Sequence, residues 1–386
     1  MTANASTSPS AGTSSAGTPA TGADETDVGR PPLKVRISSP TAVLAVIPVI
    51  LGFDPGGSIV VLGMEPDTRE VHVVLRYDVP DPAVPALGEM LAEDAISLLS
   101  AQRIGTAVAV GYGRDAEIAP VMAALRSHAA RSATGFALVE QLRVAEQRYW
   151  SYVCENPECC PPEGTPFDVA DHPAARALRA ARGRVLAGRA ELAASIAAQG
   201  GRTGVAMRRA TRESLAQLGR CLSRLERAGV GASAARLTAA LGQIAVRDAI
   251  ERYRAGWSAP VEHAAFLTVA LSQPRVRDDA WARMDPAHRA AHLRLWTDLT
   301  RLARPGYVAP VASLLAFVAW QSGDGALGNV AIDRALADNP HYSMAELMRA
   351  ALASGAPPSA ALLPMTPDEV AAAYDAQETA EAAMPS

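Results

Sequence analysis

The sequence predicts an α/β N-terminal domain, with a mixed sheet, hairpins and at least one crossover helix, followed by an all-α domain. Up to about residue 172, apolar runs of strand length alternate with helical patterns, which is typical of an α/β layer. From Pro173 to about Gly355 the strand signals vanish, and alanine-rich segments carry leucines at helical spacing. The 386 residues, 49% of them hydrophobic, are enough for two domains with a sizeable core.

The two ends of the chain have weaker patterns. Residues 1–32 carry no large apolar side chain between Met1 and Val28, so we expect a disordered tail that cannot offset its chain entropy. The α/β domain then takes residues 33–172 and ends in a Cys/Pro-rich turn, and the all-α domain takes residues 173–355. Residues 356–386 are acidic, and we expect a loosely ordered C-terminal tail with a short helix from Pro367 to Gln377.

The first elements of the α/β domain follow from local patterns. Leu33 to Ile37 alternates as a strand does, and Ser39-Pro40 begins a helix over residues 41–51, in which Pro48 marks a kink or an end. The runs SIVVLGM (58–64) and VHVVLRY (71–77) flank a turn-rich segment. They predict a β-hairpin.

The later elements alternate between helix and strand. Pro82 and Pro85 open a helix that keeps its leucines mostly on one stripe, and residues 104–110 (IGTAVAV) predict a buried strand. Residues 116–131 predict a helix, so a strand, helix, strand order implies a crossover connection. Residues 136–144 and 148–154 predict a second hairpin, which places a cysteine-rich stretch at a strand end.

Composition excludes several classes of protein. The net charge of -4 and the pI near 6.0 give no global attraction to nucleic acid or to an anionic membrane. Four cysteines are too few for a secreted disulfide scaffold, and no apolar run reaches the roughly 20 residues that span a bilayer. The N-terminus lacks the pattern of a signal peptide, so we expect a cytoplasmic protein without a membrane contact. The motifs of common hydrolases, kinases, P-loop enzymes and dinucleotide-binding enzymes are missing.

The stretch CENPECCPPEGTP is the sharpest candidate site. Cys154, Cys159 and Cys160 could converge on zinc, with His172 as a fourth ligand. Against this, the spacing lacks the separated pairs of a zinc ribbon, and adjacent cysteines are expected to point apart. A redox disulfide between Cys154 and a later cysteine is a second interpretation. A rigid turn that joins the two domains, with the cysteines as small apolar residues, is the third and the most economical.

Arg76 and Asp78 close the second strand of the first hairpin and lie on the same face, two residues apart. At the carboxyl end of a strand such a pair can bind a ligand. A surface ion pair is the simpler expectation. These two residues are the candidate catalytic groups.

Charge is unevenly distributed in the second half. Residues 173–230 hold 12 arginines against three acids, whereas residues 305–386 hold two arginines against nine acids. Leu215, Leu218, Leu222 and Leu225 form a seam at steps of three and four on one predicted helix. Arg220, Arg224 and Arg227 fall largely on the other side of that helix. Such arginines suit a solvated surface, a partner for the acidic end, or anion binding.

These stretches together resemble a family found in actinobacteria and known as domain of unknown function 4192. The matching residues span roughly 33 to 356: Ser39-Pro40, Ile47-Pro48, Leu51 to Pro55, Ser58 to Val61, Arg76 to Pro80, Trp150 to Tyr152, Cys154, Cys159 to Pro161, Gly164 to Pro166, Ala319-Trp320, Gly323 to Gly325, Ala335-Leu336 and Pro340. The resemblance implies a cytoplasmic protein and supplies no activity, cofactor or partner.

The leading functional expectation is a non-catalytic interaction protein that uses its arginine-rich helical domain. A protein partner is favoured over nucleic acid, which the basic helices could also bind with steep salt dependence. The enzymatic alternative is an unfamiliar site at the domain junction, built from Arg76, Asp78 and the cysteine turn. It requires these residues to meet in one cleft.

Overall fold

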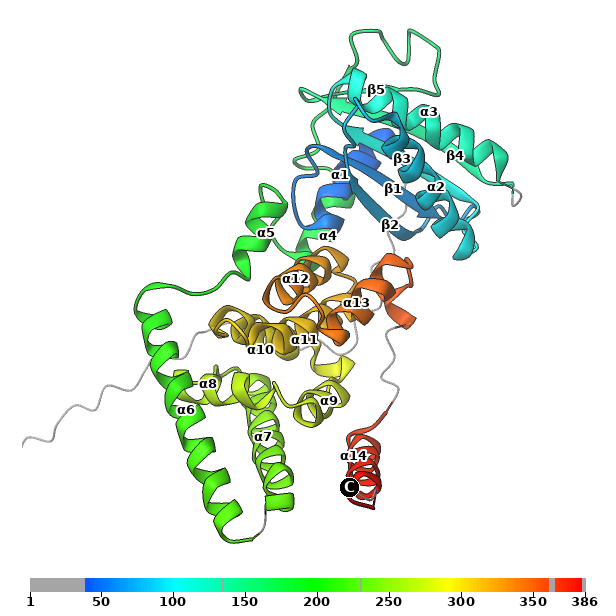
Figure 1. Ribbon diagram of the computed structural model, residues 1–386. Helices are drawn as coiled ribbons and strands as arrows, with labels where there is room; N and C mark the ends of the chain where they lie inside the picture. Colours follow the sequence, from blue (N-terminus) through cyan, green and yellow to red (C-terminus); the bar gives the residue numbers. More distant parts are fainter. Residues whose placement is uncertain (1–38, 133–134, 230, 361–364, 384–386) are drawn as a thin grey trace, which may run out of the picture.

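The computed structural model describes residues 39–132, 135–229, 231–360 and 365–383. The predicted tail at 1–32 and the predicted strand from Leu33 to Ile37 lie outside the described residues. Within them, a six-stranded mixed sheet occupies the N-terminal half and helices fill the C-terminal half (Figure 1), which confirms the predicted fold class. No helix in these ranges has both the length and the apolar character needed to cross a membrane.

The sheet has the strand order β2-β1-β3-β4-β5-β6. Its strands are β1 (Ser58–Met64), β2 (Val71–Asp78), β3 (Thr106–Tyr112), β4 (Ala137–Ala145), β5 (Arg148–Ser151) and β6 (Thr165–Pro166). The pairs β1/β2 and β4/β5 are antiparallel, so both predicted hairpins form. β3 also pairs antiparallel with β1 and parallel with β4. The short β6, which local patterns do not predict, adds to the edge of β5.

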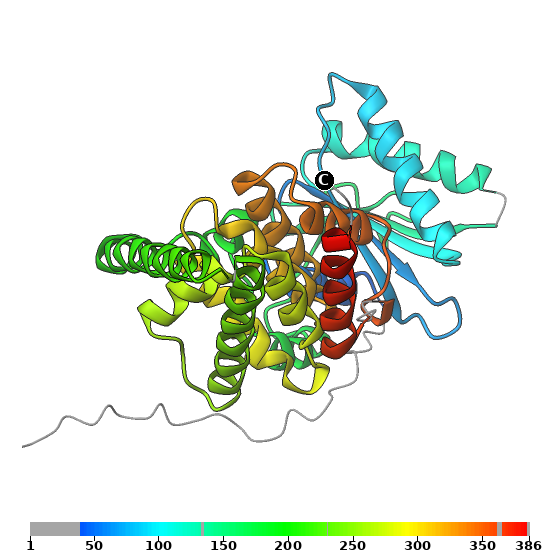
Figure 2. The ribbon, with the colours of Figure 1, turned by 60° about the horizontal axis from the view of Figure 1, so that its bottom comes forward.

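Two crossover helices cover one face of the sheet. α2 (Pro85–Ala101) connects β2 to β3, and α3 (Asp115–Arg131) connects β3 to β4. Alternate residues of the strands, such as Ile59, Val61 and Ala109, pack against the apolar stripes of both helices. Figure 2 shows these two helices on the side of the sheet away from the C-terminal helices.

The opposite face of the sheet is covered by α1 (Pro40–Leu51). Ser39 caps this helix by accepting a hydrogen bond from the Ala42 amide, and Gly52 ends it at a φ of 78°. Pro48 lies inside the helix, which continues through it to Leu51. The far side of α1 packs on α4 (Pro173–Arg182), so that α1 is buried between the sheet and α4. β1 is therefore covered on both faces, and all seven of its residues are buried.

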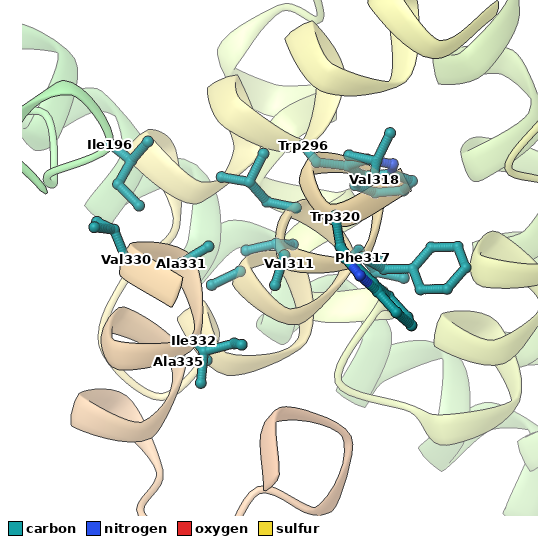
Figure 3. Close-up of a cluster of buried hydrophobic side chains, with 14 of the residues drawn as sticks. Ile196, Trp296, Val311, Phe317, Val318, Trp320, Val330, Ala331, Ile332 and Ala335 are labelled. Atoms are coloured by element: carbon teal, nitrogen blue, oxygen red, sulfur yellow. The ribbon is translucent and has the colours of Figure 1, made fainter. Parts of the chain in front are cut away.

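The C-terminal half is a bundle built around one apolar helix. Its remaining helices are α5 (Arg189–Ser195), α6 (Gly201–Arg227), α7 (Gly231–Arg254), α8 (Val261–Ala270), α9 (Pro274–Ala282), α10 (Arg289–Leu302), α11 (Val308–Gln321), α12 (Gly325–Asp338), α13 (Ser343–Ala353) and α14 (Pro367–Ala383), with short 3₁₀ turns at Pro286–His288 and Pro358–Ala360. Every residue of α11 from Val308 to Trp320 is buried. Figure 3 shows Phe317 and Trp320 of α11 beside Trp296 of α10, with side chains of α12 nearby.

The two halves are joined by a common core and by polar contacts. One apolar cluster runs from α1 and the sheet into the helical bundle. Phe53, after α1, forms a parallel bridge with Leu186, which follows α4. The side-chain amide of Gln102, which follows α2, donates a hydrogen bond to the carbonyl of Ser354 after α13 at 3.1 Å. The bundle and the sheet domain therefore share buried surface on the α1 side.

Asp338 caps the start of the buried helix α11 from the end of α12. Its carboxylate accepts hydrogen bonds from the amides of Gly306 (2.7 Å), Val308 (3.0 Å) and Ala309 (3.1 Å). These amides lie at the positive end of a helix that has no side-chain cap of its own, so the charge is well placed.

We expect Asp338→Ala to lower the free energy of unfolding by about 2 kcal/mol, because it removes a charged cap from three amides at the start of a buried helix. Urea unfolding of the purified chain measures this loss. Asp333→Ala on the same helix is the matched control, since its pairs with Arg189 and Arg349 are half exposed and contribute at most about 1 kcal/mol. Equal losses from the two variants would contradict the capping role.

Candidate functional site

Arg76 and Asp78 form an ion pair at the end of β2, with 2.6 Å between the guanidinium and the carboxylate. The Arg76 Nε donates a hydrogen bond to the Ser58 hydroxyl on the neighbouring strand, and the guanidinium lies 5.9 Å from the centre of the Phe53 ring. Asp78 itself is largely exposed, at 83%. Arg76 thus contacts Asp78, Ser58 and Phe53, and these contacts fix its side chain at the edge of the sheet.

A cavity of about 490 Å³ opens beside this pair, where β2 and β3 end and α3 begins. Its lining is Gly57, Val79, Pro80, Asp81, Pro82, Tyr112, Gly113 and Glu117. The Tyr112 hydroxyl is buried with no hydrogen-bond partner among the described residues, and burial raises its pKa above the ordinary value. Hydrogen bonds from Arg114 lower the pKa of Glu117 and keep it ionised. The lining includes two carboxylates, Asp81 and Glu117, and no histidine, cysteine or lysine.

The cysteine turn lies at the other edge of the sheet. Four strand steps separate β2 from β5, and at a spacing of about 4.8 Å per step this places these two strands about 19 Å apart. The segment between β5 and β6 projects from the end of the sheet domain that is far from the helical bundle (Figure 1). The structure therefore does not bring Arg76 and Asp78 together with the cysteines, and the cysteine turn does not lie between the two domains.

Cys154, Cys159 and Cys160 do converge. Their three sulfur atoms all lie within 4.8 Å of one another. His172 lies outside this group: it precedes α4, and its Nδ1 accepts a hydrogen bond from the Ala174 amide at 3.3 Å. The structure thus assembles three of the four residues that the sequence indicates as metal ligands.

The expectation that the adjacent Cys159 and Cys160 point apart is wrong for this turn. The Asn156 carbonyl accepts hydrogen bonds from the amides of Cys159 (3.1 Å) and Cys160 (2.7 Å), which closes one helical turn. Neighbouring side chains in a helical turn are about 100° apart, whereas they face opposite sides in an extended strand. None of the three cysteines has a positive φ, so the convergence needs no left-handed backbone.

The start of the turn is fixed to β4. The Ser151 hydroxyl donates to Glu140 at 2.8 Å and accepts from the amides of Val153 (3.1 Å) and Cys154 (3.0 Å). The Tyr152 amide also donates to the Gln141 carbonyl at 2.8 Å. Cys154 is therefore placed by a network that begins inside the sheet.

The end of the turn is fixed by Trp150 and Arg148. The indole Nε1 of Trp150 donates to the Pro162 carbonyl at 2.9 Å, and Arg148 donates to the Gly164 carbonyl at 2.6 Å. A Cβ on Gly164 would lie 2.5 Å from the Trp150 ring, and its φ is +83°, so only glycine fits there. The Arg143 guanidinium lies 3.6 Å from the centre of the same ring on its β4 side, in a cation–π contact. The turn is closed at both ends.

The environment shifts the pKa values of Cys154 and Cys160 in opposite directions. Burial, then hydrogen bonding to Cys154 and Cys159, raises the pKa of Cys160 to about 12. A hydrogen bond from Cys160, followed by one from the Asn156 backbone, lowers the pKa of Cys154. The sequence signal for the cluster was the cysteine spacing, whereas the supporting residues Ser151, Glu140 and Trp150 have no spacing motif that could have identified them.

The arginine-rich helix α6 supplies the other candidate surface. We define the α6–α7 arm as residues 201–229 and 231–254. The buried residues of α6 are Gly204, Met207, Ala210 and Thr211, all in its first half. From residue 212 onward no residue is fully buried, although the leucine seam, Leu215, Leu218, Leu222 and Leu225, lies there. The seam remains partly open to solvent.

The acidic C-terminal helix α14 binds to the bundle next to the arm. Arg275 of α9 lies 2.7 Å from Asp375 and 3.0 Å from Glu378, and Arg236 of α7 also pairs with Glu378. Val370 of α14 is buried beside a cavity of about 130 Å³, with Trp281 among its lining residues. Among the described side chains, the acidic end thus pairs with arginines that follow the basic block and not with Arg220, Arg224 or Arg227.

Comparison with known proteins places the chain in a family. Neither the curated proteins nor the solved structures gave a match. A family profile described as Domain of unknown function (DUF4192) matches residues 40–359, from the start of α1 to the turn after α13. This match covers most of the chain and includes the sheet, the cysteine turn and the α6–α7 arm. The chain therefore belongs to the DUF4192 family, a domain of unknown function.

Proposed function

We propose that this chain is a non-catalytic interaction protein whose α6–α7 arm binds an acidic, amphipathic helix of a partner protein. The observation that carries the proposal is the partly exposed leucine seam of α6, together with exposed apolar side chains on α7. Leu215 is 39% exposed, and Leu237, Leu241 and Ile244 on α7 are 43%, 44% and 54% exposed. Apolar side chains gathered on neighbouring helices are typical of a helix-binding surface.

The charges beside the seam favour an acidic partner. Arg220 and Arg224 have no ion pair within the described part of the chain. A helix with leucines toward the seam and carboxylates on its flanks would bury the apolar groups and neutralise the arginines. Opposite charges at the rim of such an interface speed association and set the partner's orientation.

The same chain already holds a helix of this kind. α14 places Val370 and Tyr374 against α9, while Asp375 and Glu378 pair with Arg275. This contact combines an apolar centre with arginine–carboxylate pairs at its side. We expect the external partner to use the same chemistry on the arm.

The alternatives have less support. The enzymatic alternative loses the shared cleft that it required, because its two groups of residues lie at opposite edges of the sheet. Nucleic-acid binding would use the arginines but leaves the apolar seam without a role. All four cysteines are free, which suits the reducing cytoplasm that we propose for the protein and its partner.

A photo-reactive residue at Leu222 tests the surface directly. We expect it to cross-link a partner from a cell lysate that the same residue at Met90 does not cross-link, although Met90 on α2 is 63% exposed. The partner recovered in this way is then purified, and its affinity is measured by titration.

The charge contribution is tested on that purified pair. We expect Arg220→Glu with Arg224→Glu to weaken binding about tenfold or more, because like charges then face the acidic helix. Arg103→Glu, a single reversal at an exposed arginine of the sheet domain, should leave the affinity unchanged. Equal cross-linking from positions 222 and 90 would contradict the proposal. A salt-sensitive complex with DNA or RNA instead of a protein would assign the arm to nucleic-acid binding.

A further inference from the structure

We propose that Cys154, Cys159 and Cys160 bind one zinc ion as three thiolate ligands, with the fourth coordination position open to solvent. This site is separate from the α6–α7 arm and does not depend on the function proposed for it. The inference starts from the three sulfur atoms, which lie within 4.8 Å of one another. None of the three cysteines is fully buried.

The spacing of the sulfur atoms fits a shared ion. Zinc–thiolate bonds are about 2.3 Å long, so two thiolates on one zinc lie about 3.8 Å apart in a tetrahedral site and at most about 4.6 Å apart. The observed limit of 4.8 Å needs only a small inward movement of side chains. A disulfide would use two of the sulfurs and leave the third without a role.

The kind of ligand selects the kind of ion. Thiolates favour soft or borderline cations such as zinc and Cu(I) over magnesium or calcium, which take oxygen ligands. Three protein ligands with an open fourth position are the arrangement of reactive zinc sites, whereas structural zinc sites have four. Cys159 is exposed, so the open position faces solvent, where water or a small thiol can complete the tetrahedron.

The surroundings hold the ligands in place before any ion binds. The Ser151–Glu140 pair fixes Cys154, and the Asn156 carbonyl fixes Cys159 and Cys160 through their amides. Neighbouring hydrogen bonds that orient the ligands in this way are a common supporting feature of metal sites. Binding converts three thiols and Zn²⁺ into a tris-thiolate zinc complex and releases three protons to the solvent.

The experiment uses the full chain, reduced and freed of metal with a chelator under nitrogen. Zinc is added in competition with a chromophoric chelator, and native mass spectrometry counts the ions bound. We expect one zinc per chain. We expect each of Cys154→Ser, Cys159→Ser and Cys160→Ser to lower the zinc affinity by at least about 100-fold, because each removes a ligand.

Cys221→Ser is the matched control, since Cys221 lies on α6 and is the one cysteine outside the cluster. It should bind zinc as the natural chain does. Alkylation followed by mass spectrometry gives a second readout: zinc should protect three thiols and leave Cys221 reactive. Melting temperatures of the metal-free variants check that each serine variant is folded.

Each contrary result overturns the assignment. No zinc uptake by the reduced chain would do so, as would unchanged affinity in the single serine variants. Uptake of Cu(I) without uptake of zinc would reassign the ion. A disulfide from Cys154 to Cys159 or Cys160 that forms in preference to zinc binding, in reducing and zinc-containing buffer, would make the turn a redox site.

Discussion

Replacing Phe317 with alanine is expected to lower the free energy of unfolding by about 3–5 kcal/mol. Phe317 is 2% exposed and lies next to Trp320 in the buried apolar cluster (Figure 3). Its ring meets Trp281 edge-on at 5.4 Å and Trp320 edge-on at 6.3 Å. The truncation therefore removes buried apolar area and two aromatic contacts, and leaves a cavity between α9 and α11.

Phe317→Leu is the control that separates the cavity from the loss of the ring. Leucine fills most of the space, so the expected loss is only about 1.5 kcal/mol. Urea unfolding followed by circular dichroism measures both variants. A loss below about 1 kcal/mol for the alanine variant would show that the surrounding helices close over the site.

The same substitution has an expected effect at a distance. Trp281 lines the cavity under α14, together with Val370 and Tyr374. Because Phe317 supports the Trp281 ring, the alanine variant should also loosen the α14 contact. Hydrogen exchange of the α14 amides, compared between the alanine and leucine variants, would detect this.

The sequence predicts best those parts of the fold where local pattern and tertiary burial agree. SIVVLGM is apolar throughout because β1 is covered on both faces, and its predicted bounds match the observed strand. β6 was missed because a pair of residues, one of them proline, has no period that a pattern could show. The strand order, which separates Arg76 from the cysteines, is set by which strands pair across the sheet and leaves no mark on local spacing.

For the candidate sites, too, local spacing predicts some features and misses those that depend on tertiary structure. The period of three and four on α6 correctly identifies an apolar seam but does not say what covers it, and the structure leaves it partly exposed. The cysteine spacing suggests sulfurs that point apart, because it assumes an extended backbone. A single helical turn at Asn156 reverses that expectation. Spacing alone could not show the turn, since it depends on closure of the loop at Ser151 and Trp150.

Below about pH 6.5, stability is expected to fall because of one buried histidine. His292 on α10 is 1% exposed, and its Nε2 accepts a hydrogen bond from the Asp285 amide at 3.4 Å. Burial, helped by the nearby charge of Arg254, lowers the pKa of His292 from 6.5 to about 4. In the folded chain the imidazole therefore stays neutral where an unfolded chain takes up a proton.

The sign of the pH dependence follows from that difference in bound protons. Between pH 6.5 and about 4 the unfolded state binds more protons than the folded state, so stability rises with pH in this window. The stability that the neutral His292 contributes is fully present above pH 6.5 and is lost as the pH falls toward 4. The shift of the pKa corresponds to about 3 kcal/mol across the window.

Unfolding free energies measured at several pH values between 4 and 7.5 test this for the natural chain, His292→Asn and His341→Asn. Asparagine is polar but cannot titrate, so its curve should be flatter by up to about 1.4 kcal/mol per pH unit within the window. His341 is exposed, and its variant should keep the slope of the natural chain. If His292→Asn runs parallel to the natural chain, carboxylates and not the buried imidazole set the acid limit of this fold. If the curves converge toward pH 4, protonation of His292 is the event that opens the bundle around α10.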